Sequence, residues 1–164
     1  MTLPSDRARA CNALIVGGAI VLGIVLVFVI LLAQARAEPI APGAIHVIDG
    51  DTIAVGPAHY RLVGFDTPEA GERARCPAER MLSTLATQRL RQIVAGGGLD
   101  LEEVDCRCRP GTAGTQRCNH GRLCGRLTAN GQDVGETLLA EGYAQPYAYD
   151  PDAPRRPATW CGRP

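Results

Sequence analysis

A long apolar segment near the N-terminus does most to constrain how this chain of 164 residues folds. Residues 13–34 contain no charged side chain, and about twenty apolar residues in a helix suffice to cross the hydrocarbon core of a bilayer. Arg7 and Arg9 precede the segment, which predicts that residues 1–12 stay in the cytoplasm and that the rest of the chain is exported. Small residues around Ala35 also suit signal-peptide cleavage, so the segment is either a retained transmembrane anchor or a cleaved signal.

The cysteine pattern agrees with export to the periplasm or the cell exterior, with the domain membrane-anchored if the segment is kept and secreted if it is cleaved. Six of the seven cysteines follow the apolar segment: Cys76, Cys106, Cys108, Cys118, Cys124 and Cys161. An even number of cysteines in a small exported domain predicts up to three disulfide bonds. At least one bond is expected to close the loop 107–119, and Cys161 is expected to tie the C-terminal tail to Cys76 or to this loop.

A zinc site is the alternative for part of this cysteine cluster. Its ligands would be Cys106, Cys108, Cys118 and His120. The spacing of these residues is not a standard zinc pattern, and an oxidising compartment leaves few free thiolates to bind a metal. Disulfide bonds are therefore the favoured interpretation.

The overall charge gives no independent sign of a polyanionic partner. The chain has 17 basic and 17 acidic residues, so no strong positive field surrounds it. Every basic residue is an arginine, which binds oxyanions through two parallel hydrogen bonds. A biased genome composition is the favoured explanation for the absence of lysine, and phosphate preference is the alternative.

The remaining chain divides into a linker at residues 35–43, one domain at residues 44–150, and a tail rich in proline and arginine at residues 151–164. β-Branched and apolar runs predict five strands, at residues 45–48, 52–55, 60–65, 99–104 and 123–128. A helix is expected from Pro77 to Gly96, and a second is expected to begin after Asp133. This order predicts an α+β, mainly β fold: an OB-type five-stranded barrel with two to three helices, preceded by the N-terminal hydrophobic helix.

Apolar residues recur at helical spacing in the first of these helices, which predicts which side of the helix is buried. The predicted buried face consists of Leu82, Leu85, Ala86, Leu90 and Ile93. The predicted solvent-facing side consists of Glu79, Ser83, Thr87 and Arg91.

Three carboxylates and one guanidinium lie close together in the sequence, at the ends of short apolar runs: Asp51, Arg61, Asp66 and Glu69. Hard cations such as Ca²⁺ bind clustered carboxylate and carbonyl oxygens, and a transferring phosphoryl group is stabilised by positive charge aimed at its oxygens. Each aspartate by itself is more typical of a turn than of a metal site. Together, these residue types are the minimum for metal-assisted cleavage of a phosphodiester.

Three ordered motifs carry a family resemblance. They are Val-Ile-Asp-Gly-Asp-Thr at residues 47–52, an Arg and Asp-Thr-Pro-Glu within residues 61–69, and Gly-Arg at residues 121–122. In this order they resemble the staphylococcal nuclease, or thermonuclease, family over residues 45–149. The family has a tyrosine where this chain has His120, and its fold is an OB barrel with three helices. The tail of this chain is too short and too rich in proline for the third helix.

The resemblance implies a role for each matching residue. Asp51, Asp66 and the backbone carbonyl of Thr67 would bind Ca²⁺, with Asp49 tuning the site from outside the ligand set. Glu69 would act as general base, and Arg61 and Arg122 would hold the scissile phosphate. The substrate-binding residues would be His120, Tyr147 and Tyr149.

One geometric condition attaches to these roles. Side chains alternate between the two faces of a straight strand, so Arg61 and Asp66 would point in opposite directions. They converge only if the chain bends near Phe65, which the resemblance implies.

The resemblance therefore implies a monomeric, Ca²⁺-dependent nuclease that hydrolyses single-stranded or locally open DNA and RNA, with weak sequence preference and 3′-phosphate products. The alternative is a catalytically inactive OB-fold module that binds nucleic acid or envelope components, and a third possibility is a purely structural envelope protein. All five groups with assigned chemistry are present, which favours the enzyme.

Overall fold

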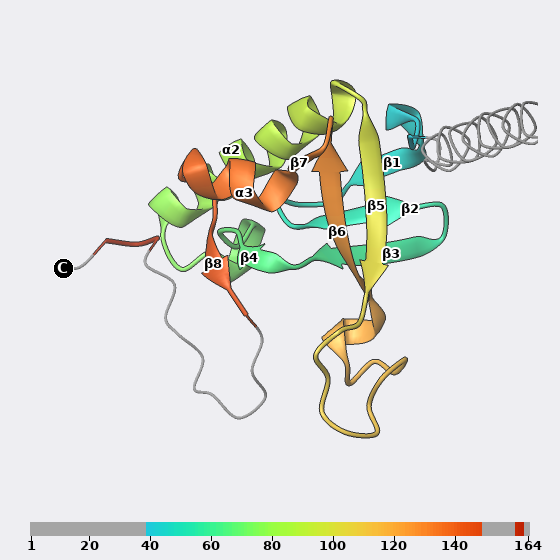
Figure 1. Ribbon diagram of the computed structural model, residues 1–164. Helices are drawn as coiled ribbons and strands as arrows, with labels where there is room; N and C mark the ends of the chain where they lie inside the picture. Colours follow the sequence, from blue (N-terminus) through green and yellow to red (C-terminus); the bar gives the residue numbers. More distant parts are fainter. Residues whose placement is uncertain (1–38, 149–159, 163–164) are drawn as a thin grey trace, which may run out of the picture. The chain divides into compact units, whose positions relative to one another are not determined.

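The computed structural model describes residues 39–148 and 160–162, in which short β-strands combine with two α-helices (Figure 1). The apolar segment 13–34, the N-terminal residues 1–12 and most of the tail 151–164 lie outside the described residues. Within residues 39–148 and 160–162, no helix is both long enough and apolar enough to cross a membrane.

The main sheet has the strand order β1-β2-β3-β6-β5, and a short strand, β7, also pairs with β6. Its pairs are antiparallel except for β3 and β6, which run parallel. The strands are β1 (Ile45–Val47), β2 (Thr52–Val55), β3 (Ala58–Leu62), β5 (Leu99–Val104), β6 (Leu123–Ala129) and β7 (Gln132–Asp133). A separate two-stranded sheet consists of β4 (Gly64–Asp66) and β8 (Gln145–Tyr147).

Figure 1 shows the main sheet curled into a half-barrel, with two α-helices packed against it. The helices are α2 (Pro77–Ala95) and α3 (Val134–Ala140), and the 3-10 turns are η1 (Pro42–Ala44), η2 (Gly71–Arg73) and η3 (Asn119–Gly121). The core between sheet and helices includes Ile53, Leu62, Phe65, Leu90, Leu127 and Leu138. This mainly β architecture is consistent with the OB-like fold predicted from the order of the elements.

The strand predicted at residues 60–65 is divided into β3 and β4. Gly64 has a φ of 96°, a left-handed conformation that glycine adopts without steric cost. This conformation interrupts the strand after Leu62 and starts a new one in a different sheet. The other predicted strands are confirmed to within one residue at each end. Strands β5 and β6 pair antiparallel.

Helix α2 begins and ends as predicted, and its predicted buried face is confirmed in part. Ala86 and Leu90 are buried as predicted and Leu82 and Ile93 are half-buried, but Leu85 is exposed. Glu79 and Ser83, predicted to face solvent, are buried, and apolar spacing missed them because they are polar. Each polar group has partners that make burial tolerable: the Glu79 carboxylate pairs with Arg75, and the Ser83 hydroxyl donates to the Arg80 carbonyl at 2.9 Å.

Both helices have the end signals that the sequence indicated. Pro77 is the first residue of α2, and the Cys76 Sγ accepts a hydrogen bond from the Glu79 N–H. Asp133 caps α3 by accepting from the Glu136 N–H at 3.0 Å. After α3, Gly142 has a φ of 78°, typical of the residue that closes a helix.

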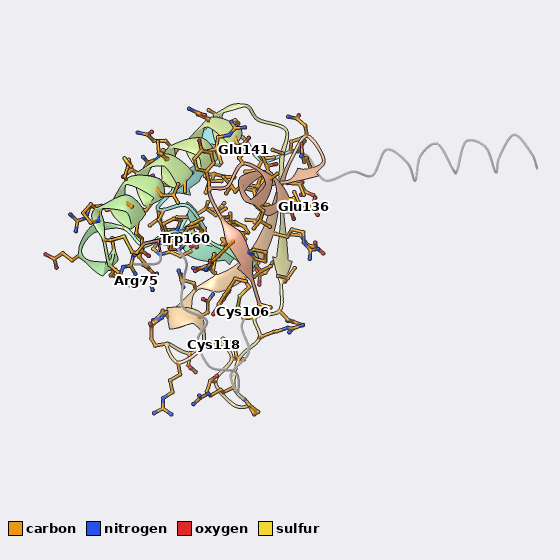
Figure 2. The ribbon with its side chains drawn as sticks, turned by 90° about the vertical axis from the view of Figure 1, so that its left-hand side faces the viewer. Arg75, Cys106, Cys118, Glu136, Glu141 and Trp160 are labelled. Carbon is orange, nitrogen blue, oxygen red and sulfur yellow. A yellow bond between two sulfur atoms is a disulfide. The ribbon has the colours of Figure 1, made fainter. Side chains whose placement is uncertain are left out.

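The six cysteines that follow the apolar segment lie in three pairs at disulfide-bonding distance. The pairs are Cys76–Cys161, Cys106–Cys124 and Cys108–Cys118. Two of them close the loop between β5 and β6, as predicted, and Figure 2 shows Cys106 and Cys118 in this loop. Cys161 joins the tail to the start of α2 instead of to the loop. The alternative zinc site loses its thiolates because they pair with other cysteines.

Candidate active site

The bend at Gly64 brings together two side chains that a straight strand would separate. Arg61 lies near the end of β3 and Asp66 is the last residue of β4. The Arg61 Nη2 lies 2.6 Å from the Asp66 Oδ1. The geometric condition stated for these two residues is therefore met, with the bend one residue before Phe65.

Asp51 joins this pair from the turn between β1 and β2. It is only 4% exposed, and the Arg61 Nη1 lies 2.8 Å from its Oδ1. The backbone N–H and the hydroxyl of Thr67 both donate to its Oδ2, each at 3.1 Å. One guanidinium thus contacts both aspartates, and Thr67 holds the more buried one in place.

Gly50 is required for this packing. A Cβ atom at position 50 would lie 2.7 Å from the Thr67 Oγ1 and 2.9 Å from the Thr67 Cβ, closer than real Cβ atoms approach a neighbour. A glycine therefore allows the turn that carries Asp51 to press against Thr67. The sequence motif contains this glycine, but only the packing reveals what its missing side chain permits.

Burial raises the pKa of Asp51 to about 6, although the positive charge of Arg61 opposes the shift. The neighbouring carboxylates of Asp49 and Asp66 raise the pKa further. Burial also acts to lower the pKa of Arg61, but Asp51 and Asp66 outweigh it and raise this pKa. Asp49, Asp51 and Asp66 thus concentrate negative charge at this place, and Arg61 is the cation that contacts Asp51 and Asp66.

Arg122 approaches the same place from the residue between η3 and β6. Its Nη1 donates to the Thr52 hydroxyl at 3.0 Å, and its Nε and Nη2 donate to the backbone and side-chain oxygens of Asn119, each at 3.1 Å. Burial and then the positive charge of Arg61 lower the pKa of Arg122. Within the described part of the chain, Arg122 forms no ion pair. A half-buried guanidinium bonded to neutral oxygens and facing a second guanidinium is suited to an anionic ligand.

Glu69 lies in the loop between β4 and α2 and is more accessible than the aspartates. Its side chain is 51% exposed, and its Oε2 lies 3.2 Å from the Arg73 Nε. The hydrogen bonds and ion pairs of the described residues do not connect its carboxylate to Asp51, Asp66 or Arg61. The positive charge of Arg73 also contributes to the lowered pKa of Arg122, as the smallest of the named causes.

Of the three predicted substrate-binding residues, Tyr147 has a contact with the cluster. It lies on β8, opposite Gly64 of β4, and the Arg61 guanidinium carbon is 5.8 Å from the centre of its ring. The ring remains available because Tyr147 is 42% exposed. His120 is exposed beside Arg122 and has a left-handed φ of 57°. Tyr149 lies outside the described residues.

Asn119 and Thr52 are site residues that the sequence motifs did not single out. Asn119 has a left-handed φ of 51°, which asparagine tolerates better than most residues. Its position two residues before a glycine-arginine pair was the available signal. Thr52 ends the motif at residues 47–52 but had no assigned role, and its hydroxyl links Arg122 to the Asp51 turn by donating to the Asp51 Oδ1 at 3.2 Å.

Comparison with known proteins identifies two nucleases as relatives. No protein-family model matches the chain. The chain is 35% identical over 112 residues to Endonuclease YncB of Bacillus subtilis (strain 168), covering 64% of this chain and 47% of YncB. It is 33% identical over 112 residues to the SPbeta prophage-derived endonuclease YokF of the same organism, covering 64% of this chain and 34% of YokF. The chain thus spans less than half the length of these relatives, and its similarity to them indicates a relationship with nucleases.

Proposed function

We propose that this protein is an endonuclease of the thermonuclease type, which hydrolyses phosphodiester bonds of single-stranded DNA and RNA. Two relatives bear the name endonuclease. The observation that carries the proposal is the convergence of Arg61 and Arg122 beside two aspartates. Arg61 contacts both carboxylates, and Arg122 has neutral partners and a pKa lowered partly by Arg61.

In this proposal, the two arginines hold the oxygens of the scissile phosphate. Guanidinium groups bind phosphate through paired N–H donors, and they act most strongly where negative charge increases in the transition state. Asn119 and Thr52 orient Arg122 before the substrate arrives. Because these groups grip phosphate instead of base edges, we expect weak sequence preference. The exposed ring of Tyr147 supplies a stacking surface for one base.

The oxygens of this site fit a hard divalent cation, and we propose Ca²⁺. Asp51, Asp66 and the Thr67 carbonyl offer the ligand type that Ca²⁺ prefers. The two carboxylates already converge on one positively charged group, Arg61, and burial disfavours an ionised Asp51 without a cation nearby. When bound, Ca²⁺ would neutralise charge on the substrate phosphate.

Glu69 is the proposed general base, which accepts a proton from the attacking water. Its half-exposed carboxylate is accessible to water, and its pairing with Arg73 is at the surface, where such pairs are weak and easily exchanged. The loop that carries Glu69 follows directly after the Thr67 contact with Asp51. The proposed base is therefore two residues from Thr67 along the chain.

We also propose that the domain acts outside the cytoplasm as a monomer. The support is the apolar segment 13–34, which is either an anchor or a cleaved signal, together with three cysteine pairs that require an oxidising compartment. In a cell-fractionation experiment, the full chain should be found at the membrane if the segment is kept and in the exported fraction if it is cleaved.

The direct test is hydrolysis of denatured DNA and of RNA by the purified protein, with Ca²⁺ or with a chelator. We expect cleavage with Ca²⁺ that the chelator abolishes. Arg122→Ala should lower kcat/KM by about 100-fold, as loss of one transition-state donor typically does, and Glu69→Gln should lower kcat by a similar factor. Arg126→Ala is the matched control, because Arg126 on β6 pairs with Glu102 at the surface.

Each outcome has a separate meaning. Cleavage that continues in the presence of the chelator would show that the reaction does not depend on Ca²⁺. Full turnover by Glu69→Gln would show that Glu69 is not the general base. Equal losses of kcat/KM for Arg122→Ala and Arg126→Ala would show that Arg122 does not hold the scissile phosphate. Binding of denatured DNA without cleavage would identify a non-catalytic OB module instead.

A further inference from the structure

A second carboxylate, Glu79, organises the loop that carries Glu69. This loop runs from Thr67 to Cys76, between β4 and α2, and contains the single turn of η2. Glu79 lies in the first turn of α2 and is 1% exposed, which is unusual for a glutamate. Neither the sequence motifs nor the proposed mechanism gives this buried charge a function.

The Glu79 carboxylate interacts with both ends of the segment between Glu69 and Arg75. The Arg75 N–H donates to its Oε2 at 2.7 Å, and the Arg75 Nε and Nη2 donate to the carboxylate at 3.2 and 3.3 Å. At the other end, the backbone N–H of Glu69 acts on the same carboxylate to lower its pKa. One side chain thus acts on both ends of a seven-residue segment that has no strand or α-helix of its own.

The disulfide between Cys76 and Cys161 covers this carboxylate. The Cys161 Sγ lies 3.6 Å from the Glu79 Oε2, and one carboxylate oxygen and both sulfurs lie within 4.8 Å of one another. Figure 2 shows Arg75 and Trp160 near the start of α2, where Cys161 pairs with Cys76. Cys161 therefore contributes to the burial of the Glu79 carboxylate, and burial strengthens its hydrogen bonds.

We propose that Glu79 is a positioning residue for Glu69, a proposal that rests on the function proposed above. Ordering the backbone of a free loop costs conformational entropy at every residue. The bonds to Glu79 order this loop during folding, so Glu69 is already near the phosphate site when the substrate binds. A catalytic group misplaced by about 1 Å can lose about 100-fold in rate. Arg61 and Arg122 are held by other contacts, so the effect of Glu79 should fall on kcat.

The test is a cycle of variants in the full chain: wild type, Glu79→Gln, Glu69→Gln and the double variant. A glutamine presents one acceptor oxygen and an NH₂ group to a site where every partner is a donor. We expect Glu79→Gln to lower kcat on denatured DNA by about 10- to 100-fold, with KM within about 3-fold of wild type. In the Glu69→Gln background, Glu79→Gln should lower kcat further by less than about 2-fold, because its effect acts through Glu69.

Glu141→Gln is the matched control. Glu141 also accepts two hydrogen bonds from an arginine of α2, Arg89, at 2.6 and 2.7 Å, but at the opposite end of the helix from the loop. This variant should keep the wild-type kcat. If Glu79→Gln does not fold, Arg75→Met takes its place, because it removes two of the bonds to Glu79 at a half-exposed position. It should show a smaller loss of kcat and the same dependence on Glu69.

The positioning role is overturned if Glu79→Gln keeps the wild-type kcat, or lowers kcat by the same factor with and without Glu69. A loss confined to KM would overturn it as well. These results leave the proposed function standing. If the wild type does not cleave, or if Glu69→Gln turns over normally, the proposed function fails and the role of Glu79 fails with it.

Discussion

Asn119 determines where the Arg122 guanidinium points. Its side-chain oxygen accepts from the Arg122 Nη2 at 3.1 Å, while its side-chain nitrogen donates to the Arg122 and Leu123 carbonyls, each at 3.2 Å. The left-handed backbone at Asn119 makes this possible, because it turns the side chain back over the following residues. The side-chain amide of Asn119 therefore links the backbone at the end of the β5–β6 loop to the Arg122 guanidinium, which is proposed to hold the phosphate.

Replacing Asn119 with glycine tests this link. Glycine keeps the left-handed backbone but removes the amide, so Arg122 loses one hydrogen bond and gains freedom. We expect kcat/KM on denatured DNA to fall by about 10-fold, at the lower end of the loss expected for one hydrogen bond to a charged group. The control is Asn130→Gly, the same substitution at a φ of 53° in the β6–β7 turn. Equal activities of the two variants would contradict the role of Asn119.

Cys76 performs two functions at the start of helix α2. Its sulfur accepts the first-turn N–H of Glu79, and it bonds to Cys161 of the tail, 85 residues away. The Cys108–Cys118 pair closes only 10 residues within the β5–β6 loop. Because a cross-link restricts the unfolded chain more when it closes a longer loop, the two bonds should differ in their contribution to stability.

Removing each bond in turn measures this difference. Cys76→Ser with Cys161→Ser should lower the free energy of unfolding by roughly 4 kcal/mol, and Cys108→Ser with Cys118→Ser by roughly 2.5 kcal/mol. Serine at position 76 can still cap α2, so the larger loss comes from the cross-link. Urea unfolding of both double variants provides the measurement. A larger loss for the Cys108–Cys118 pair would contradict the chain-entropy explanation.

The long-range pairing of the sheet assembles the site from distant segments. Strands β3 and β6 run parallel, with Arg61 opposite Cys124. Arg122, the residue before β6, therefore lies close to Arg61, which contacts both aspartates. The separate β4–β8 sheet then sets Tyr147 across from Gly64. Helix α2 connects to the Glu69 loop through the bonds of Glu79, and to β1 through the Arg91 Nη2, which donates to the Val47 carbonyl at 3.4 Å.

The stability of the whole domain should fall in acid, partly because of Glu79. Burial acts to raise the pKa of Glu79, but hydrogen bonds from Arg75 and Glu69 outweigh it and hold the pKa below the ordinary value of 4.5. The unfolded chain therefore takes up this proton at a higher pH than the folded domain does. The stabilisation is complete above about pH 5 and is lost as the pH falls through the folded pKa.

Urea unfolding of the wild type and Glu79→Gln between pH 7 and 3 tests this expectation. The wild type should be more stable at pH 7, and the two curves should converge in acid, with slopes that differ by up to about 1.4 kcal/mol per pH unit. Comparing the two proteins cancels the opposite contribution of Asp51, whose pKa is raised to about 6. A constant difference across this range would show that folding does not change the pKa of Glu79.

The sequence by itself determined the features that depend on neighbours along the chain. Alternating β-branched residues predicted the strands, Pro77 and Asp133 predicted the helix starts, and the motif residues Asp51, Arg61 and Asp66 predicted a charged site. Such signals are readable because backbone preferences and turn chemistry act over a few residues.

Only the tertiary structure decided which distant groups meet. The choice of Cys76 as the partner of Cys161, the orientation of Arg122 by Asn119, and the burial of Glu79 all arise from contacts between separate elements. Glu79 shows the physical reason. A glutamate on a helix reads as a solvent-facing residue, because its burial becomes favourable only when several donors from a neighbouring loop converge on its carboxylate.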